Sequence, residues 1–142
     1  MPRIHLHELE DVDRDAAFSA ARASRSAWRR AAFDDRPAFD AWTERPDVAA
    51  HAILEDDAVV GIAAAMDVEG EREILLAVSP DADVDAPTEA LRLLTTQEAE
   101  RPLYACVAAT DAPSFDVLAR LGFVEDRHDG DDVVLVLPPT LE

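Results

Sequence analysis

Near its C-terminal end the chain reads Asp111-Ala-Pro-Ser114-Phe-Asp-Val-Leu118-Ala-Arg-Leu-Gly122-Phe123. This pattern is typical of a loop, a short amphipathic helix over residues 114–121 and a glycine exit. Upstream lies a stretch with the layout of a strand, a tight loop and a helix N-terminus, and it reads Val78-Ser-Pro80-Asp81-Ala-Asp83-Val-Asp85-Ala86-Pro87-Thr88-Glu89. The second stretch therefore predicts a strand that leads through a tight loop into a helix.

Length and composition predict one globular domain over residues 1–142. Of the 142 residues 49% are hydrophobic, which is enough apolar material for a single core. No apolar run approaches the ~20 residues that span a bilayer. The N-terminus lacks the charged-then-apolar layout of a signal peptide. We therefore expect a cytoplasmic protein without a membrane partner.

The net charge of −18 is carried by a chain in which all 13 basic residues are arginine. Such a negative field repels nucleic acid and anionic lipid, so nucleic acid is not an expected partner. The acidic residues are dispersed along the sequence and do not form one tail. A solvated acidic surface, as in adaptation to high salt, therefore explains them better than mimicry of nucleic acid.

Apolar periodicity and turn signals predict seven strands and five helices. The strands are expected at residues 4–9, 48–55, 59–68, 71–78, 103–109, 123–127 and 133–137. The helices are expected at residues 11–23, 26–33, 37–43, 87–100 and 114–121. Turns are expected at Asp56-Asp57, at Gly70 and at Asp129-Gly130-Asp131.

A few side chains outside the quoted stretches are candidates for chemistry. His5 and His7 lie at i and i+2 of the first strand and can ligate a metal, but no third ligand is placed by the sequence, so a polar strand face is the alternative and no metal is assigned. The single cysteine, Cys106, lies in an apolar run and is interpreted as a buried small hydrophobe. The aromatic residues Trp28, Phe33, Phe39 and Trp42 either line a substrate pocket or pack helices against the sheet.

The order of the elements and the two quoted stretches resemble the GNAT family of acyl-CoA-dependent acetyltransferases. That family typically has a strand ending in Val-x-Pro, then Arg/Gln-x-x-Gly-x-Gly/Ala at a helix start, and later Asn-x-x-Ala/Ser and Gly-Phe. Val78, Pro80, Ser114 and Gly122-Phe123 match, and Asp111 replaces the asparagine. The resemblance implies an α/β fold with a mixed, twisted sheet of about seven strands flanked by helices.

The resemblance also implies acetyl-CoA or another acyl-CoA as cofactor. The binding residues that it carries over are Val78, Asp83, Ala86, Pro87, Thr88, Asp111 and Ser114. In the family the backbone N–H groups of this loop hold the cofactor pyrophosphate at a helix N-terminus.

The loop departs from the family pattern in ways that oppose phosphate binding. Asp83 stands at the Arg/Gln position, Ala86 and Thr88 stand at the two glycines, and Pro87 removes one N–H donor. Four acids and no base lie around the loop, namely Asp81, Asp83, Asp85 and Glu89. Like-charge repulsion is expected to weaken pyrophosphate binding, and Asp85 is expected to cap the helix in place of the anion.

Catalytic groups are few. Leu118 occupies the position where the family often has a tyrosine general acid, and the only tyrosine, Tyr104, lies on the preceding strand and is interpreted as packed. A base for deprotonating an amine can come from Glu71 or Glu73, which lie on the same strand face. Glu73 is taken as the candidate, with surface solvation as its alternative role.

Two functions remain open from the sequence. One is transfer of an acyl group from acyl-CoA to a small-molecule or protein amine, for which the acidic surface favours a cationic acceptor. The other is a GNAT-fold module without catalytic activity that binds a ligand or a partner. The partner options include a homodimer and a heterodimer, and a dimer partner with an intact cofactor loop would make this chain regulatory.

Overall fold

The computed structural model describes residues 3–9, 14–24, 28 and 35–139, and these residues form seven strands and four helices. The strands are β1 (Ile4–Glu8), β2 (Ala49–Glu55), β3 (Ala58–Val68), β4 (Glu71–Val78), β5 (Leu103–Ala108), β6 (Val124–Asp129) and β7 (Asp132–Leu137). The helices are α1 (Arg14–Ala23), α2 (Arg36–Thr43), α3 (Ala86–Gln97) and α4 (Ala112–Arg120). None of the helices in these described ranges is both long and apolar enough to cross a membrane.

The seven strands and four of the five helices expected from the sequence are confirmed, with small differences at their ends. The helix expected at residues 26–33 lies outside the described residues except for Trp28. Helix α4 begins two residues earlier than expected, because Asp111 caps it through an acceptor bond from the Ser114 N–H. Strand β6 begins after Phe123, because the Phe123 N–H donates to Leu118 O and belongs to the helix exit.

The expected turns are confirmed by backbone conformation. Asp56 has φ 54° between β2 and β3, and Glu69 and Gly70 have φ 51° and 84° between β3 and β4. Gly130 has φ 63° between β6 and β7. Positive φ at these positions matches the right-handed twist of paired strands, which is why short acidic or glycine-containing turns connect them.

The seven strands form one sheet with the order β1-β2-β3-β4-β5-β7-β6. All neighbours are antiparallel except β4 and β5, which are parallel. A parallel pair needs a crossover connection, and α3 supplies it. The mixed sheet flanked by helices is the α/β architecture expected from the sequence.

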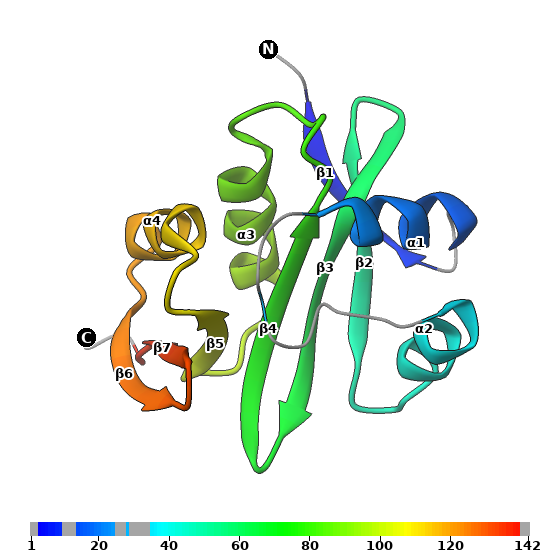
Figure 1. The fold of residues 1–142 in the computed structure, drawn as a ribbon. Helices are drawn as coiled ribbons and strands as arrows, with labels where there is room; N and C mark the ends of the chain where they lie inside the picture. Colours follow the sequence, from blue (N-terminus) through cyan, green and yellow to red (C-terminus); the bar gives the residue numbers. More distant parts are fainter. Residues whose placement is uncertain (1–2, 10–13, 25–27, 29–34, 140–142) are drawn as a thin grey trace.

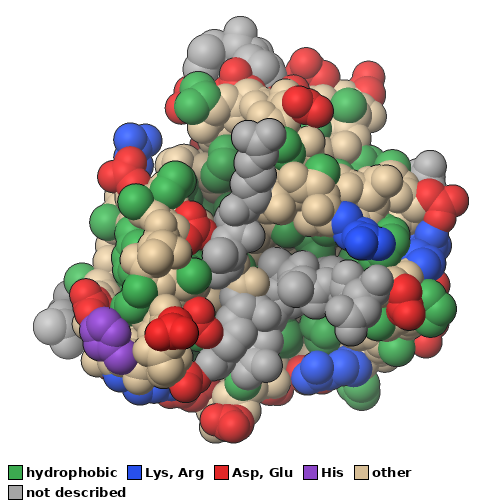
Figure 2. Space-filling view, viewed as in Figure 1, with side chains coloured by type: hydrophobic (Ala, Val, Ile, Leu, Met, Phe, Trp, Pro, Cys, Tyr) green, Lys and Arg blue, Asp and Glu red, His purple; other side chains and the backbone are tan. Residues whose placement is uncertain are grey.

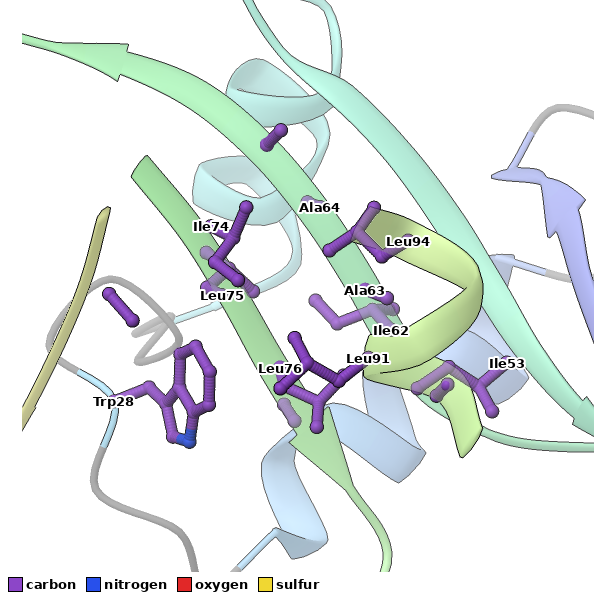
Figure 3. Packing of buried hydrophobic residues seen from close by; sticks show 14 of the residues in the cluster. Trp28, Ile53, Ile62, Ala63, Ala64, Ile74, Leu75, Leu76, Leu91 and Leu94 are labelled. Atoms are coloured by element: carbon purple, nitrogen blue, oxygen red, sulfur yellow. The ribbon is translucent and has the colours of Figure 1, made fainter. Parts of the chain in front are cut away.

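Helices cover both faces of the sheet. Helix α1 packs against β3 and β4, and α3 packs against β1, β3, β4 and α4. Figures 1 and 3 place α1 and α3 on opposite faces of β3 and β4. Both faces of β3 are therefore buried: its consecutive residues Ile62, Ala63, Ala64 and Ala65 have no exposed surface. This explains why β3 is almost continuously apolar, without the alternation of a half-exposed strand.

Several side chains that the sequence singled out belong to this core. Cys106 is buried, as expected, and so are Phe39 and Trp42 of α2. The rings of His5 and His7 lie 4.7 Å apart between centroids. No group of three metal-ligating side chains occurs in the described part of the chain, so the two histidines have no third ligand there.

The sheet opens between β4 and β5. Their ladder contains only the pairs Arg72–Leu103, Glu73–Tyr104 and Ile74–Ala105. Strand β4 continues to Val78 on β3, whereas β5 continues on β7. The sheet is thus split toward the carboxyl ends of its two parallel strands, and Figure 1 shows β5, β7 and β6 turning away from β4.

We expect Gly61→Ala to destabilise the protein, because this glycine holds β3 close to the end of β4. A Cβ at Gly61 would lie 2.2 Å from Ala77 O and 2.9 Å from Val78 Cα. The expected loss of unfolding free energy is at least about 2 kcal/mol, as for overpacking of a close contact. Urea denaturation measures it.

The matched control is Gly130→Ala, where a Cβ meets nothing within 4 Å. Its positive φ alone predicts a loss of about 1 kcal/mol. Equal losses for the two variants would contradict the proposed close approach of β3 and β4.

Candidate functional site

A cleft of about 290 Å³ lies where β4 and β5 diverge. Strand β4 contributes Leu76 and Val78, and the segment after it contributes Ser79, Pro80, Ala82, Asp83, Val84 and Pro87. The opposite wall consists of Asp111, Pro113, Ser114 and Val117 from the start of α4, and Trp28 completes the lining. The lining is mainly apolar, and no arginine is among the described residues that form it.

Trp28 is placed at the opening of the sheet by two contacts. Its backbone forms an isolated antiparallel bridge with Val107 of β5. Its indole Nε1 donates a hydrogen bond of 2.9 Å to Ser114 Oγ, and the side chain is only 4% exposed. Figure 3 shows the indole beside the end of β4. Trp28 therefore both packs in the buried core and lines the cleft, whereas Phe39 and Trp42 pack in the core alone.

Ser114 and Asp111 continue this hydrogen-bond chain. Ser114 Oγ donates to Asp111 Oδ2 at 2.6 Å, and Asp111 Oδ1 accepts from the Ser114 N–H at 3.4 Å. The Asp111 carboxylate therefore caps α4 and also accepts a hydrogen bond from the Ser114 hydroxyl, which in turn accepts from Trp28. Asp111 and Ser114 fit the helix-start positions of the family pattern and also build the wall of the cleft.

The structure brings together five of the residues that the resemblance carried over to cofactor binding. Val78, Asp83, Pro87, Asp111 and Ser114 all line the cleft. Ala86 is fully buried under the helix start, and Thr88 is half-buried beside it. Neither lines the cleft, so their expected role is confined to the backbone N–H groups of the first turn of α3.

The N–H groups of residues 81–89 are mostly engaged within the protein. Those that donate belong to Asp81, Ala82, Asp83, Asp85, Ala86 and Glu89. Pro87 has no N–H, as the sequence indicated. Among residues 81–89, all of which the structure describes, only the N–H groups of Val84 and Thr88 have no acceptor. Two of these nine residues therefore have an N–H group without an acceptor, and the expected weak binding of a phosphate by this loop stays a prediction.

Two of the acceptors are carboxylates. Glu55 Oε1, at the end of β2, accepts from the Asp83 N–H at 2.6 Å. Asp83 Oδ2 in turn accepts from the Asp85 N–H at 3.1 Å. Both bonds place a carboxylate on N–H groups of the loop that the resemblance assigns to the cofactor pyrophosphate.

The prediction that Asp85 caps α3 is wrong. Asp85 occupies the N-cap position but its side chain makes no capping hydrogen bond. Its backbone is helical (φ −89°, ψ −5°), whereas a capping side chain normally comes with an extended backbone. Two residues earlier, the Asp83 carboxylate accepts from the Asp85 N–H itself.

One of the four loop acids has a basic partner. Arg92, one turn along α3, forms a salt bridge with Glu89. The hydrogen bond from Arg92 lowers the pKa of the Glu89 carboxyl. Asp81 and Asp85 are exposed. Figure 2 shows further acidic side chains scattered around the same face of the molecule rather than gathered in one patch.

Glu73, the candidate base, is buried rather than solvated. Glu73 is only 4% exposed, and in the sheet it pairs with Met66 of β3 and Tyr104 of β5. Strand alternation places it on the face opposite Leu76 and Val78, which line the cleft. The surface role that the sequence offered for Glu73 is therefore wrong, and its catalytic role stays a prediction.

Leu118, at the position of the family's tyrosine acid, and Tyr104, the only tyrosine of the sequence, both pack against other side chains. Leu118 is fully buried in the core. Tyr104 is half-buried, with the guanidinium of Arg127 5.5 Å from its ring centroid, and burial raises the pKa of its hydroxyl. Neither lines the cleft.

Glu55 is the residue that sequence reasoning missed. It is separated from Asp83 by 28 residues, and no local pattern marks a strand-end glutamate as a ligand of a distant loop. The only signal is topological: β2 and β4 flank β3, so the end of β2 lies near the start of the loop.

No protein-family model and no curated protein matches the sequence. Solved structures match it over nearly its whole length. The ribosomal-protein-S18-alanine N-acetyltransferase of Escherichia coli has 18% identity and a TM-score of 0.73, with 100% of this chain and 96% of that chain covered.

Two further solved structures of N-acetyltransferases match this chain over most of its length. The N-acetyltransferase PseH of Campylobacter jejuni, in complex with acetyl coenzyme A, has 11% identity and a TM-score of 0.71, with 97% and 100% covered. A GCN5-related N-acetyltransferase from Brucella melitensis has 19% identity and a TM-score of 0.70, with 95% and 75% covered. The chain has the GNAT fold. The fold expected from the resemblance is therefore confirmed, at identities that leave the loop and the catalytic groups to be argued from this chain alone.

We expect Ser114→Ala to destabilise the GNAT fold at the opening of its sheet. The change leaves the buried Trp28 Nε1 without its acceptor and removes the donor to Asp111, which predicts a loss of about 1–3 kcal/mol. Urea denaturation measures the loss, and tryptophan fluorescence reports the changed surroundings of the indole.

Ser79→Ala is the matched control, since Ser79 lines the same cleft but its hydroxyl accepts only the exposed Asp81 N–H at 3.3 Å. We expect a change within about 0.5 kcal/mol there. A Ser114→Ala protein as stable as the Ser79→Ala protein would show that Ser114 does not hold Trp28 in place.

Proposed function

We propose that this protein transfers an acyl group from an acyl thioester to an amine. The single observation that carries the proposal is the apolar cleft at the split between β4 and β5, in a chain with the GNAT fold over its whole length. Beyond Ile74, β4 has no strand partner on the cleft side, so backbone groups of that edge face the opening. A narrow, largely uncharged arm such as that of a pantetheine thioester fits both the lining and this edge.

An acyl-CoA fits the site in part. The apolar walls suit its thioester arm, with Leu76, Val78 and Val117 as the residues that would hold it. The loop does not suit its diphosphate, because most N–H donors are engaged and two acceptors are carboxylates. We therefore assign the arm, and not the diphosphate, as the part of the donor that the cleft recognises best.

In the reaction the amine nitrogen attacks the thioester carbonyl, a C–N bond forms, the C–S bond breaks, and the amine proton is transferred to leave a thiol. The protein contributes chiefly by orienting the two reactants. Glu73 remains the proposed base. Because it lies on the face of β4 opposite the cleft, this role requires the amine to approach from that face. The net charge of −18 supports a cationic amine as acceptor, small molecule or protein, because long-range attraction raises the rate of encounter.

A second candidate is a binding module without transferase activity. The specific observation that favours it is the loop, in which only the N–H groups of Val84 and Thr88 lack an acceptor within the described ranges. Leu118, at the position where the family often has a proton donor, agrees with it. Binding of an acyl thioester without turnover of any amine would favour this alternative.

Calorimetric titration with acetyl-CoA at low and high salt tests the proposed site. We expect binding that is tighter at high salt, because salt screens the repulsion between the acidic protein and the anionic ligand. Val117→Trp, which fills the cleft, is expected to weaken binding at least tenfold.

The matched control is Val124→Trp, since Val124 is 55% exposed on β6 and does not line the cleft. This variant is expected to bind as the unchanged protein does. No binding of acetyl-CoA or of S-acetylpantetheine at either salt would overturn the proposal, and so would equal effects of the two tryptophans.

A further inference from the structure

The contact between Glu55 and the loop after β4 joins two distant parts of the chain. Glu55 ends β2, just before the turn at Asp56, and the β2–β3 pairing shifts register between Ile53 and Leu54. This irregularity lies next to Leu54, the residue before Glu55, and irregularities of this kind locally bend a strand. The half-buried Glu55 side chain then accepts the Asp83 N–H at 2.6 Å, across β3.

The short distance marks a charge-assisted bond. A carboxylate that accepts a backbone N–H at 2.6 Å makes one of the stronger hydrogen bonds in proteins. Among the N–H groups of residues 81–89, Asp83 is the one whose acceptor comes from outside the loop and helix. The loop conformation is therefore coupled to β2 through one anionic side chain.

Asp83 extends the effect of this bond. With its N–H held by Glu55, Asp83 turns its own carboxylate to the Asp85 N–H at 3.1 Å, while its carbonyl accepts the Ala86 N–H at 3.0 Å. Glu55 and Asp83 thus satisfy, with carboxylate oxygens, donors that would otherwise be free to meet an anion at the start of α3.

We propose that Glu55 determines the donor specificity of the cleft by occupying the anion position of the loop. This inference rests on the proposed acyl-thioester site and names the part of the donor that the site rejects. A diphosphate can take the Asp83 N–H only if the Glu55 carboxylate leaves it, and the displaced charge stays nearby and repels the incoming anion. The protein accordingly binds acyl donors through the pantetheine arm and gains little or nothing from a diphosphate.

The experiment compares two ligands that share the thioester arm and differ in the diphosphate, acetyl-CoA and S-acetylpantetheine. Their dissociation constants are measured by calorimetry or by NMR titration at fixed salt. For the unchanged protein we expect the two constants to agree within about threefold. For Glu55→Ala we expect acetyl-CoA to bind at least tenfold more tightly, with S-acetylpantetheine unchanged. Glu55→Gln, which keeps an acceptor but loses the charge, is expected to lie between them.

Asp81→Asn is the matched control, because it removes one negative charge from the same loop without releasing a backbone N–H. We expect it to change the acetyl-CoA constant less than threefold. An unchanged S-acetylpantetheine constant in every variant reports that the cleft remains folded.

Each other outcome overturns the inference in a recognisable way. If the unchanged protein binds acetyl-CoA far more tightly than S-acetylpantetheine, the diphosphate is already accommodated. If Glu55→Ala and Asp81→Asn act alike, only the charge of the loop matters. If S-acetylpantetheine binds but Glu55→Ala gains nothing for acetyl-CoA, the inference fails and the proposed cleft survives. If neither ligand binds any variant, both proposals fail.

Discussion

The separation of β4 from β5 is the constraint on which the rest of the structure depends. After Ile74–Ala105 the two parallel strands no longer share a ladder, so unpaired backbone and apolar surface would be exposed at the centre of the sheet. Trp28 is packed there, and its indole N–H is satisfied by Ser114. Asp111, the cap of α4, also accepts the hydrogen bond from this serine hydroxyl and so orients it. The start of α4, the position of Trp28 and the wall of the cleft therefore depend on one another.

The elements of the fold were predictable because each is encoded locally. The apolar run of β3, the glycine or acidic turns and the Gly122-Phe123 exit are patterns over a few residues, and the structure agrees with them. The errors at element ends have local causes of their own, such as the cap at Asp111 and the bond from the Phe123 N–H to Leu118 O. The strand order was not predicted, because the family resemblance gave only a mixed sheet of about seven strands and periodicity contains no pairing information.

The site was predictable only where its residues are consecutive. Val78, Asp83 and Pro87 follow one strand, and Asp111 and Ser114 begin one helix, so their grouping follows from the two quoted stretches. Which carboxylate faces which N–H depends on backbone angles, and this is why Asp85 was assigned a cap that it does not make. The contact of Glu55 with Asp83 needs the β2-β3-β4 order, which no window of sequence contains.

Two electrostatic effects of different range act on an anionic ligand of this cleft. The dispersed acids of a chain with net charge −18 act over distances comparable to the Debye length, about 10 Å at 0.1 M salt, and salt screens them. The bond between Glu55 and the Asp83 N–H spans 2.6 Å with no room for an ion between its atoms, so salt weakens it far less. High salt can therefore restore the approach of a phosphate-bearing donor without freeing the amide that would bind it. The net negative charge of the protein and the Glu55 carboxylate thus oppose binding of an anionic donor separately. Only the Glu55 carboxylate acts on a particular N–H group of the loop.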